Sequence, residues 1–157
     1  MVDAVFVDSN ILLHAAIPDI GNDSPEVKLQ KHEACLAQLQ RFLDEGVGLW
    51  NNGQVLREFW VQATRYETEA GPMPLSWVHE RIAWFRAFVR EVDETPAVRD
   101  QLLTLLQEYD VRGIAVHDAN IVATMLAQDI GSVCTLDAGF ERYRERIMII
   151  SPLTSTN

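Results

Sequence analysis

Four acidic residues, Asp8, Glu58, Asp118 and Asp137, occupy positions from which an α/β fold would direct side chains toward one pocket. Asp8 and Asp137 each follow an apolar run that is typical of a buried strand. Acids that follow apolar strands lie at the carboxyl edge of a parallel sheet, where open α/β folds place their sites. Carboxylates that converge there repel one another unless a cation joins them, and a cluster of oxygen ligands suits Mg²⁺ or Mn²⁺. The pattern therefore indicates metal-dependent chemistry, with phosphate esters as the favoured substrates.

Each of these acids also has a structural interpretation. Asp8, Asp118 and Asp137 stand near expected helix starts, where an aspartate can cap the helix or interact with its dipole. Glu58 falls within a helical segment, where a lone glutamate is usually solvated. Asp8 is the strongest candidate for a functional role, because aspartate is a poor strand residue and is costly to bury unpaired. The joint arrangement favours a shared site, since helix caps that arise by chance need not converge.

Smaller polar residues and arginines stand beside the acids. The candidate supporting residues are Ser9, Asn10 and Thr135. They could hydrogen-bond a carboxylate or a metal-bound water, or they could serve only local turns and caps. The candidate phosphate-binding residues are Arg57, Arg112 and Arg142. A guanidinium matches phosphate oxygens with two donors, whereas the alternative for each arginine is an ordinary surface salt bridge.

Strand-like and helix-like segments alternate along the chain. Strands are expected at 4–7, 47–50, 91–94, 132–136 and 146–150. Helices are expected at 9–17, from Ser24 to Gly46, after a cap at Asn51 or Asn52, at 76–90, at 95–109, from His117 onward and at 140–144. This order predicts the α/β class with a mostly parallel sheet.

Length and composition set further limits. The chain has 157 residues, of which 48% are hydrophobic, so we expect a single domain over 1–157 with its core at about 4–150. No apolar run approaches the ~20 residues of a membrane span, and the N-terminus lacks the layout of a signal peptide. Cys35 and Cys134 lie in apolar contexts, which predicts buried free thiols. These features predict a cytoplasmic protein without a membrane partner.

The formal net charge of −10 argues against a general nucleic-acid binder, because such proteins usually carry a basic surface. If the substrate is nucleic acid, bound metal must screen the acidic pocket and local arginines must bind the phosphates. Alternatively, a basic partner covers part of the acidic surface.

The expected helix at 76–90 carries a wide apolar face. At ~100° per residue, Trp77, Trp84 and Phe88 form one edge of this face. Aromatic side chains are favoured in the centres of interfaces, so this edge is a candidate surface for self-association or for a partner protein. The alternative is that the whole apolar face of this helix, including its aromatic edge, is covered within the core of the protein.

Four motifs together resemble those of PIN-domain proteins, in particular the ribonuclease toxins of VapBC toxin–antitoxin pairs. The matching segments are 5–13, 56–59, 117–124 and 135–140, and their order and spacing cover nearly the whole chain. The resemblance implies a three-layer sandwich with a central, mostly parallel five-stranded sheet and helices on both faces.

The resemblance also implies a function and partners. Asp8, Glu58, Asp118 and Asp137 would form an acidic quartet that holds Mg²⁺ or Mn²⁺ and cleaves RNA endonucleolytically. Ser9, Asn10 and Thr135 would line the site. The protein would be the toxin of a toxin–antitoxin pair, would form a homodimer and would be neutralised by a small antitoxin protein.

Other functions fit the sequence less well. A haloacid-dehalogenase-type phosphatase needs a second acid two positions after the first, where this chain has Asn10, and Lys28 and Lys31 are its only lysines. Neither glycine pattern of nucleotide-binding loops occurs. A PIN-like scaffold that binds RNA or protein without cleaving is the non-enzymatic alternative. The net charge favours this scaffold, whereas the complete acidic quartet argues against it.

Overall fold

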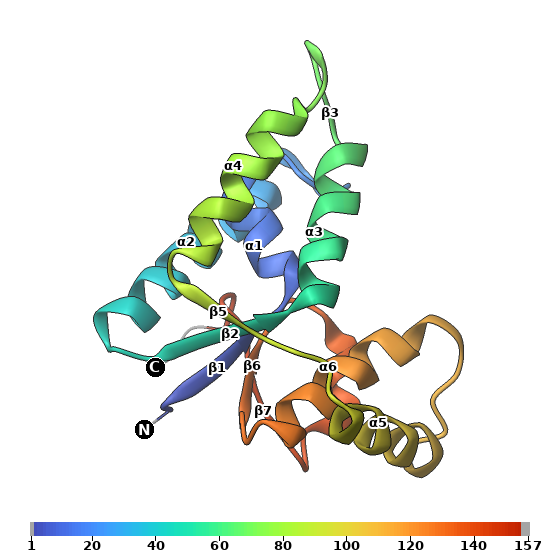
Figure 1. The fold of residues 1–157 in the computed structure, drawn as a ribbon. Coiled ribbons are helices and arrows are strands. Elements are labelled where there is room, and N and C mark those ends of the chain that lie inside the picture. The colour runs from blue at the N-terminus through green and yellow to red at the C-terminus, as the bar shows by residue number, and fades with distance from the viewer. Residues whose placement is uncertain (1, 155–157) are drawn as a thin grey trace.

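A five-stranded sheet forms the centre of the computed structural model, which describes residues 2–154 (Figure 1). Its strands are β1 (Ala4–Val7), β2 (Gly48–Asn52), β5 (Val89–Val92), β6 (Ser132–Cys134) and β7 (Met148–Ile150). They lie in the order β5-β2-β1-β6-β7, and every neighbouring pair is parallel. The predicted α/β class and parallel sheet are therefore confirmed.

Helices cover both faces of this sheet. They are α1 (Ser9–Ala16), α2 (Pro25–Asp44), α3 (Gly53–Arg65), α4 (Leu75–Arg86), α5 (Pro96–Glu108) and α6 (Val116–Ala127), with short 3₁₀ helices η1 (Gly113–Ala115) and η2 (Ala138–Tyr143). Figure 1 shows α1 to α4 on one side of the sheet and the α5–α6 pair on the other. The implied three-layer arrangement is thus present.

The helix starts follow the local sequence. Ser24 accepts a hydrogen bond from the Val27 amide at the start of α2, and Thr95 accepts one from the Val98 amide at the start of α5. A proline follows each cap, where its missing N–H costs no hydrogen bond. The predicted starts of both helices are therefore confirmed.

The expected helix at 76–90 is wrong at its end. α4 stops at Arg86, and Val89 begins strand β5 opposite Leu49 of β2. Val89 is buried in this pairing, so parallel strand pairing outweighs the helical apolar pattern. The third expected strand consequently starts two residues earlier than predicted.

Other boundaries differ by a few residues. β2 extends to Asn52, whereas β6 and β7 are shorter than the expected strands at 132–136 and 146–150. A small antiparallel hairpin, β3 (Glu67–Thr68) and β4 (Gly71–Pro72), was not predicted. It forms the tip beyond α3 in Figure 1, and its two-residue strands give too little alternation to be recognised from sequence.

The two cysteines and five of the aromatic side chains lie in one apolar core. Phe6, Phe59, Phe85, Phe140 and Tyr143 are among its largest fully buried side chains. Cys35 and Cys134 are free and buried, as predicted. Burial raises the pKa of the Cys35 thiol to about 12, so it stays protonated and unreactive at neutral pH.

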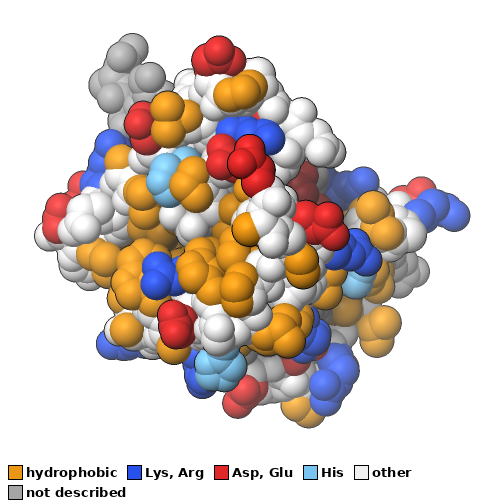
Figure 2. All heavy atoms as spheres, turned by 90° about the horizontal axis from the view of Figure 1, so that it is seen from above, with side chains coloured by type: hydrophobic (Ala, Val, Ile, Leu, Met, Phe, Trp, Pro, Cys, Tyr) orange, Lys and Arg blue, Asp and Glu red, His pale blue; other side chains and the backbone are white. Residues whose placement is uncertain are grey.

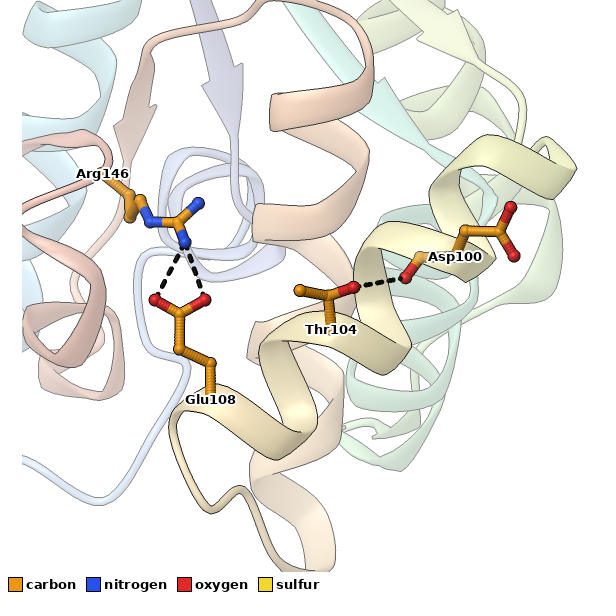
Figure 3. A network of polar contacts seen from close by, with 4 residues as sticks. All are labelled: Asp100, Thr104, Glu108 and Arg146. Carbon is orange, nitrogen blue, oxygen red and sulfur yellow. Dashed lines mark hydrogen bonds and ion pairs between the residues drawn. The ribbon is translucent and has the colours of Figure 1, made fainter.

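A surface ion pair fastens α5 to the segment before β7 (Figure 3). Arg146 Nη2 donates to both carboxylate oxygens of Glu108, at 2.9 and 2.7 Å. One turn earlier in α5, the Thr104 hydroxyl donates back to the Asp100 carbonyl at 3.2 Å.

Over residues 2–154, none of the helices has the length and apolarity that crossing a bilayer requires.

Candidate active site

Asp8 is the residue around which the site is built. It directly follows β1, caps α1 and is only 4% exposed. Its Oδ1 accepts from the Ser9 amide at 2.8 Å, and its Oδ2 accepts from Thr135 Oγ1 at 2.7 Å and Asn10 Nδ2 at 3.0 Å. Asp8 therefore acts as a helix cap and is also held by two side chains at the sheet edge.

The neighbouring strand β6 brings the second group of residues to this edge. β1 and β6 are parallel and adjacent, so their carboxyl ends meet. Asn10 Oδ1 accepts from the Leu136 amide at 3.1 Å, and Thr135 Oγ1 accepts from the Asp137 amide at 2.9 Å. The supporting residues thus join the end of β1 to the loop that carries Asp137.

Glu58 reaches the site from α3. Its Oε2 accepts from Ser9 Oγ at 2.8 Å, and its Oε1 accepts from Gln54 Nε2 at 2.8 Å. Because the Ser9 amide binds Asp8 while the Ser9 hydroxyl binds Glu58, one residue links these two carboxylates.

Asp118 and Asp137 meet at Gly139. Asp118 lies in the first turn of α6, and Asp137 caps η2 through the Gly139 amide at 2.8 Å. A Cβ atom at Gly139 would collide with Asp118 Oδ2 and would lie 3.2 Å from Asp137 Oδ1. The missing side chain of Gly139 therefore allows the two carboxylates to approach each other.

The four carboxylates interact as one electrostatic cluster. The pKa of Asp8 is raised from its ordinary 3.8 to about 7, because burial and, to a smaller extent, the charges of Glu58 and Asp118 outweigh the hydrogen bonds from Thr135 and Ser9. Burial also raises the pKa of Asp118 to about 6, with repulsion from Asp137 and Glu58 adding to the effect. Ionising all four groups together is therefore unfavourable without a neutralising cation.

The donor chemistry of this cluster fits a hard divalent cation. All four candidate ligands offer carboxylate oxygens, which Mg²⁺ and Mn²⁺ prefer. Within residues 2–154, however, no group of three Asp, Glu, His or Cys side chains is arranged to coordinate one ion directly. The cluster therefore fits an ion that keeps several waters and contacts one or two carboxylates directly, as is usual for Mg²⁺.

By sequence the chain matches no protein-family model and no curated protein. In structure it resembles VapBC2 of Rickettsia felis, solved with a promoter DNA fragment, at a TM-score of 0.68 and 12% identity over 94% of this chain and 98% of that one. VapC20 of Mycobacterium tuberculosis, a sarcin–ricin loop cleaving toxin, matches at 0.61 and 19% over 88% and 94%. A toxin–antitoxin complex from Klebsiella pneumoniae matches at 0.64 and 14% over 96% and 99%. This chain has their PIN-like fold.

Similarity at this level of identity shows the architecture, whereas function must be inferred from the site. In this PIN-like fold the sequence-predicted acids come from four separate elements: the end of β1, α3, α6 and the loop after β6. The fold gathers all four on one side of the sheet edge, together with Ser9, Asn10 and Thr135.

The three candidate arginines differ in their surroundings. Arg112 is highly exposed and forms an ion pair with Asp110 at 2.7 Å, so the structure does not bring it to the acids. Arg142 lies close enough to Asp118 for its charge to lower the pKa of that carboxyl. Arg57 is exposed beside a hollow of about 410 Å³ that is also lined by Glu58. Arg57 and Arg142 therefore flank the acidic cluster.

An amide pair behind Glu58 was not predicted from the sequence. Gln54 of α3 and Asn120 of α6 are hydrogen-bonded to each other at 2.8 Å, and Gln54 also donates to Glu58. The i, i+4 spacing of Gln54 and Glu58 on a helix was the available signal for one of these contacts. Nothing local in the sequence indicates the contact between α3 and α6.

The three candidate interface aromatics do not act as one surface. The Trp84 and Phe88 rings pack with their centroids 4.8 Å apart, and both line a groove of about 330 Å³ against Leu36 and Leu43 of α2. Trp77 is separate from this groove, and its ring is covered by the Arg81 guanidinium. Trp84 is 44% exposed, which is unusual for so large an apolar side chain.

The end of the molecule from which α3 and α4 project also carries apolar side chains. Figure 2 looks down on this end and shows them gathered across the middle of the face, with acidic and basic side chains around them. Helices α2 to α4 expose several large apolar residues: Val27, Leu29, Leu36, Leu43, Val61, Leu75 and Trp84. Exposed apolar side chains that gather on one face are typical of protein–protein contacts.

Proposed function

We propose that this protein is a divalent-metal-dependent endoribonuclease and the toxin of a toxin–antitoxin pair. The carrying observation is the cluster of Asp8, Glu58, Asp118 and Asp137 at the carboxyl edge of a PIN-like sheet, where burial and the neighbouring carboxylates raise the pKa of Asp8 and of Asp118. A structural neighbour is a toxin that cleaves the sarcin–ricin loop, which supports RNA as the substrate class.

Each acidic residue has a distinct part in this proposal. Asp8, Asp118 and Asp137 would hold Mg²⁺ or Mn²⁺ directly or through water, with Asn10 and Thr135 orienting Asp8. The ion would supply an activated water and would neutralise charge on the phosphate. Glu58, fixed by Ser9 and Gln54, would accept a hydrogen bond from the attacking water and orient it.

Two arginines would place the RNA backbone against these acids. Arg57 borders the hollow beside Glu58, and Arg142 lies beside Asp118, so a strand of RNA would cross the cluster between them. A guanidinium can bind a phosphate with two hydrogen bonds. These local charges would offset the overall charge of −10, which otherwise repels RNA.

A protein partner would use the apolar surface of α2 and α4. Neighbouring structures with this fold were solved as VapBC2 and as a toxin–antitoxin complex, which supports a small antitoxin for this protein too. We place the antitoxin or a second copy of the chain on the groove lined by Trp84 and Phe88. A basic antitoxin would also complement the acidic surface.

The proposed function is tested by incubating purified protein with a mixed RNA pool in Mg²⁺, Mn²⁺ or EDTA, beside an Asp8→Asn variant. We expect metal-dependent cutting that is absent in EDTA and reduced at least a hundredfold in the variant. Hydrolysis by water would leave a 5′-phosphate and a 3′-hydroxyl. Products with a 2′,3′-cyclic phosphate would contradict this chemistry.

The second candidate is a PIN-like scaffold that binds RNA or protein without cleaving it. The strongly negative net charge and the lack, within residues 2–154, of three acids arranged around one ion favour it. RNA binding that is equal in wild type and Asp8→Asn, with no cutting by either, would support the scaffold.

A further inference from the structure

Behind the acidic cluster, two amide side chains connect α3 to α6. Gln54 lies one helical turn before Glu58 and is only 5% exposed. Asn120 lies in α6, two residues after Asp118. A buried amide without partners is costly, so the hydrogen bonds of this pair define what it can do.

All four N–H groups of the pair are donated. Gln54 Nε2 donates to Glu58 Oε1 at 2.8 Å and to the His117 carbonyl at 3.0 Å. Asn120 Nδ2 donates to Gln54 Oε1 at 2.8 Å and to Glu94 Oε1 at 2.8 Å. A primary amide has two N–H donors, so neither residue has a donor left for another partner.

The two ends of this chain of hydrogen bonds fix its direction. Glu94 and Glu58 carry carboxylates, which only accept hydrogen bonds when they are ionised. Asn120 must therefore turn its nitrogen toward Glu94, and the same nitrogen meets the oxygen of Gln54. Gln54 is then obliged to turn its own nitrogen toward Glu58. A flipped amide at either position would set oxygen against oxygen.

This arrangement holds the Glu58 carboxylate at both of its oxygens, because Ser9 Oγ binds the other one at 2.8 Å. A carboxylate held in this way loses its rotamer freedom before substrate arrives, which is the general advantage of a preorganised site. The donors come from α1 and α3, and the Gln54 donor is in turn bound by Asn120 of α6, which also binds Glu94 before α5.

We infer that Gln54 and Asn120 are positioning residues for Glu58, and that Glu94 sets the direction of their hydrogen bonds. The inference rests on the proposed function only for its catalytic consequence. The geometry of the relay, defined as Glu94, Asn120, Gln54 and Glu58, can be tested without any substrate.

The catalytic consequence is tested with a double-mutant cycle of Gln54→Met and Glu58→Gln in single-turnover RNA cleavage. Methionine keeps the length of glutamine and removes its hydrogen bonds. We expect Gln54→Met to lower the cleavage rate about 10- to 100-fold, with little change in the RNA concentration at half-maximal rate. In the Glu58→Gln background, Gln54→Met should not lower the cleavage rate any further, since Gln54 acts through Glu58.

The matched control is Gln62→Met, an exposed glutamine on the same helix, which should leave the cleavage rate unchanged. A purely structural role for Gln54 would give equal losses in the wild-type and Glu58→Gln backgrounds, and this result would overturn the inference. A Gln54→Met rate equal to that of wild type would overturn it too.

The geometry is tested by the exchange of side-chain amide protons with water in ¹H–¹⁵N spectra of the metal-free protein. The amide protons of Gln54 and Asn120 should exchange more slowly than those of Gln62, and Asn120→Ala should speed exchange at Gln54. Equal exchange at all three amides would overturn the relay. Slow exchange together with a wild type that cleaves no RNA would support the relay and reject the proposed function, so the two failures are distinguishable.

Discussion

Asp8 combines two roles at the residue scale that differ in what they require of its charge. As a hydrogen-bond acceptor it binds the Ser9 amide, which caps α1, and the side chains of Asn10 and Thr135, and these bonds stabilise the ionised form. As a buried neighbour of Glu58 and Asp118, it is destabilised when it ionises. The metal-free protein therefore opposes the ionisation of Asp8, and shifted pKa values of this kind are common at functional sites.

This conflict makes the stability of the metal-free protein depend on pH. Because the folded pKa of Asp8, about 7, lies above its ordinary 3.8, the associated stability is complete below about pH 4 and is lost as pH rises through 7. Asp8→Asn has no charge to titrate. Between pH 4 and pH 8, the free energy of unfolding of the variant should rise relative to that of wild type by a few kcal/mol, at about 1.4 kcal/mol per pKa unit.

The measurement is chemical denaturation of both proteins in EDTA at several pH values. The absolute difference at one pH includes the hydrogen bonds that asparagine loses, so the trend with pH is the decisive quantity. A difference that stays constant from pH 4 to pH 8 would contradict the electrostatic description of the cluster.

A substitution at Gly139 should affect RNA cleavage much more than the stability of the fold. In Gly139→Ala the new methyl group would meet Asp118 Oδ2, the mobile end of a side chain, and would force this carboxylate away from Asp137. We expect RNA cleavage to fall more than tenfold while the melting temperature changes by only a few degrees. Gly131→Ala is the control, because a Cβ atom there has open space. Unaltered cleavage by Gly139→Ala would show that the approach of the two acids is unimportant.

The sequence allowed the positions of Asp8 and Asp137 at neighbouring strand ends to be predicted because their signal is local. Asp8 and Asp137 follow apolar strands, and the rule for parallel sheets places the ends of such strands together. Gln54 and Asn120 could not be predicted as a pair, because amides are common on helices and their contact joins residues 66 apart in the chain. The sheet decides which faces of α3 and α6 meet.

At the scale of elements, Asn52 connects a strand, a helix and the opposite layer. Its Oδ1 caps α3 through the Val55 amide at 3.1 Å, and its Nδ2 donates to Thr124 Oγ1 of α6 at 3.3 Å. The side chain is fully buried. Since α3 carries Glu58 and α6 carries Asp118, this residue sets the spacing of two site elements.

Asn52→Ala should therefore destabilise the protein more than the loss of an exposed cap. We expect a decrease of about 2–3 kcal/mol in the free energy of unfolding, because a buried amide and a buried hydroxyl each lose a partner. Ser24→Ala at the exposed start of α2 should cost about 1 kcal/mol or less. Equal losses in urea denaturation would show that the contact with Thr124 adds nothing.

The end of α4 shows why element boundaries were harder to predict than element types. From Leu75 to Phe88 the apolar residues keep helical spacing, so periodicity extends the helix too far. Val89 instead pairs with Leu49, which is 40 residues away, and local periodicity carries no information on this partner. The capped starts of α2 and α5 were predictable because cap and proline act within a few residues.

At the scale of the whole molecule, the groove lined by Trp84 and Phe88 is the surface we propose for self-association. Trp84→Glu would place a charge in this apolar groove, so we expect it to weaken dimerisation at least tenfold and to change stability by less than about 1 kcal/mol. His79→Glu, at an exposed position of the same helix, is the control. Sedimentation that is identical for wild type and Trp84→Glu would exclude the groove as the dimer surface.

The negative charge of the molecule would make a bound cation central to the proposed encounter with RNA. With a net charge of −10 and four interacting carboxylates, the metal-free site repels phosphate, and neutralisation at the cluster would change this locally. The most direct test is a Mn²⁺ titration followed by the relaxation of water protons, with wild type, Asp8→Asn and the distant surface variant Asp110→Asn. We predict one saturable site in wild type and Asp110→Asn, with enhanced relaxation from retained waters, and its loss in Asp8→Asn. Equal Mn²⁺ binding by wild type and Asp8→Asn, or no binding by wild type, would contradict the metal-dependent site.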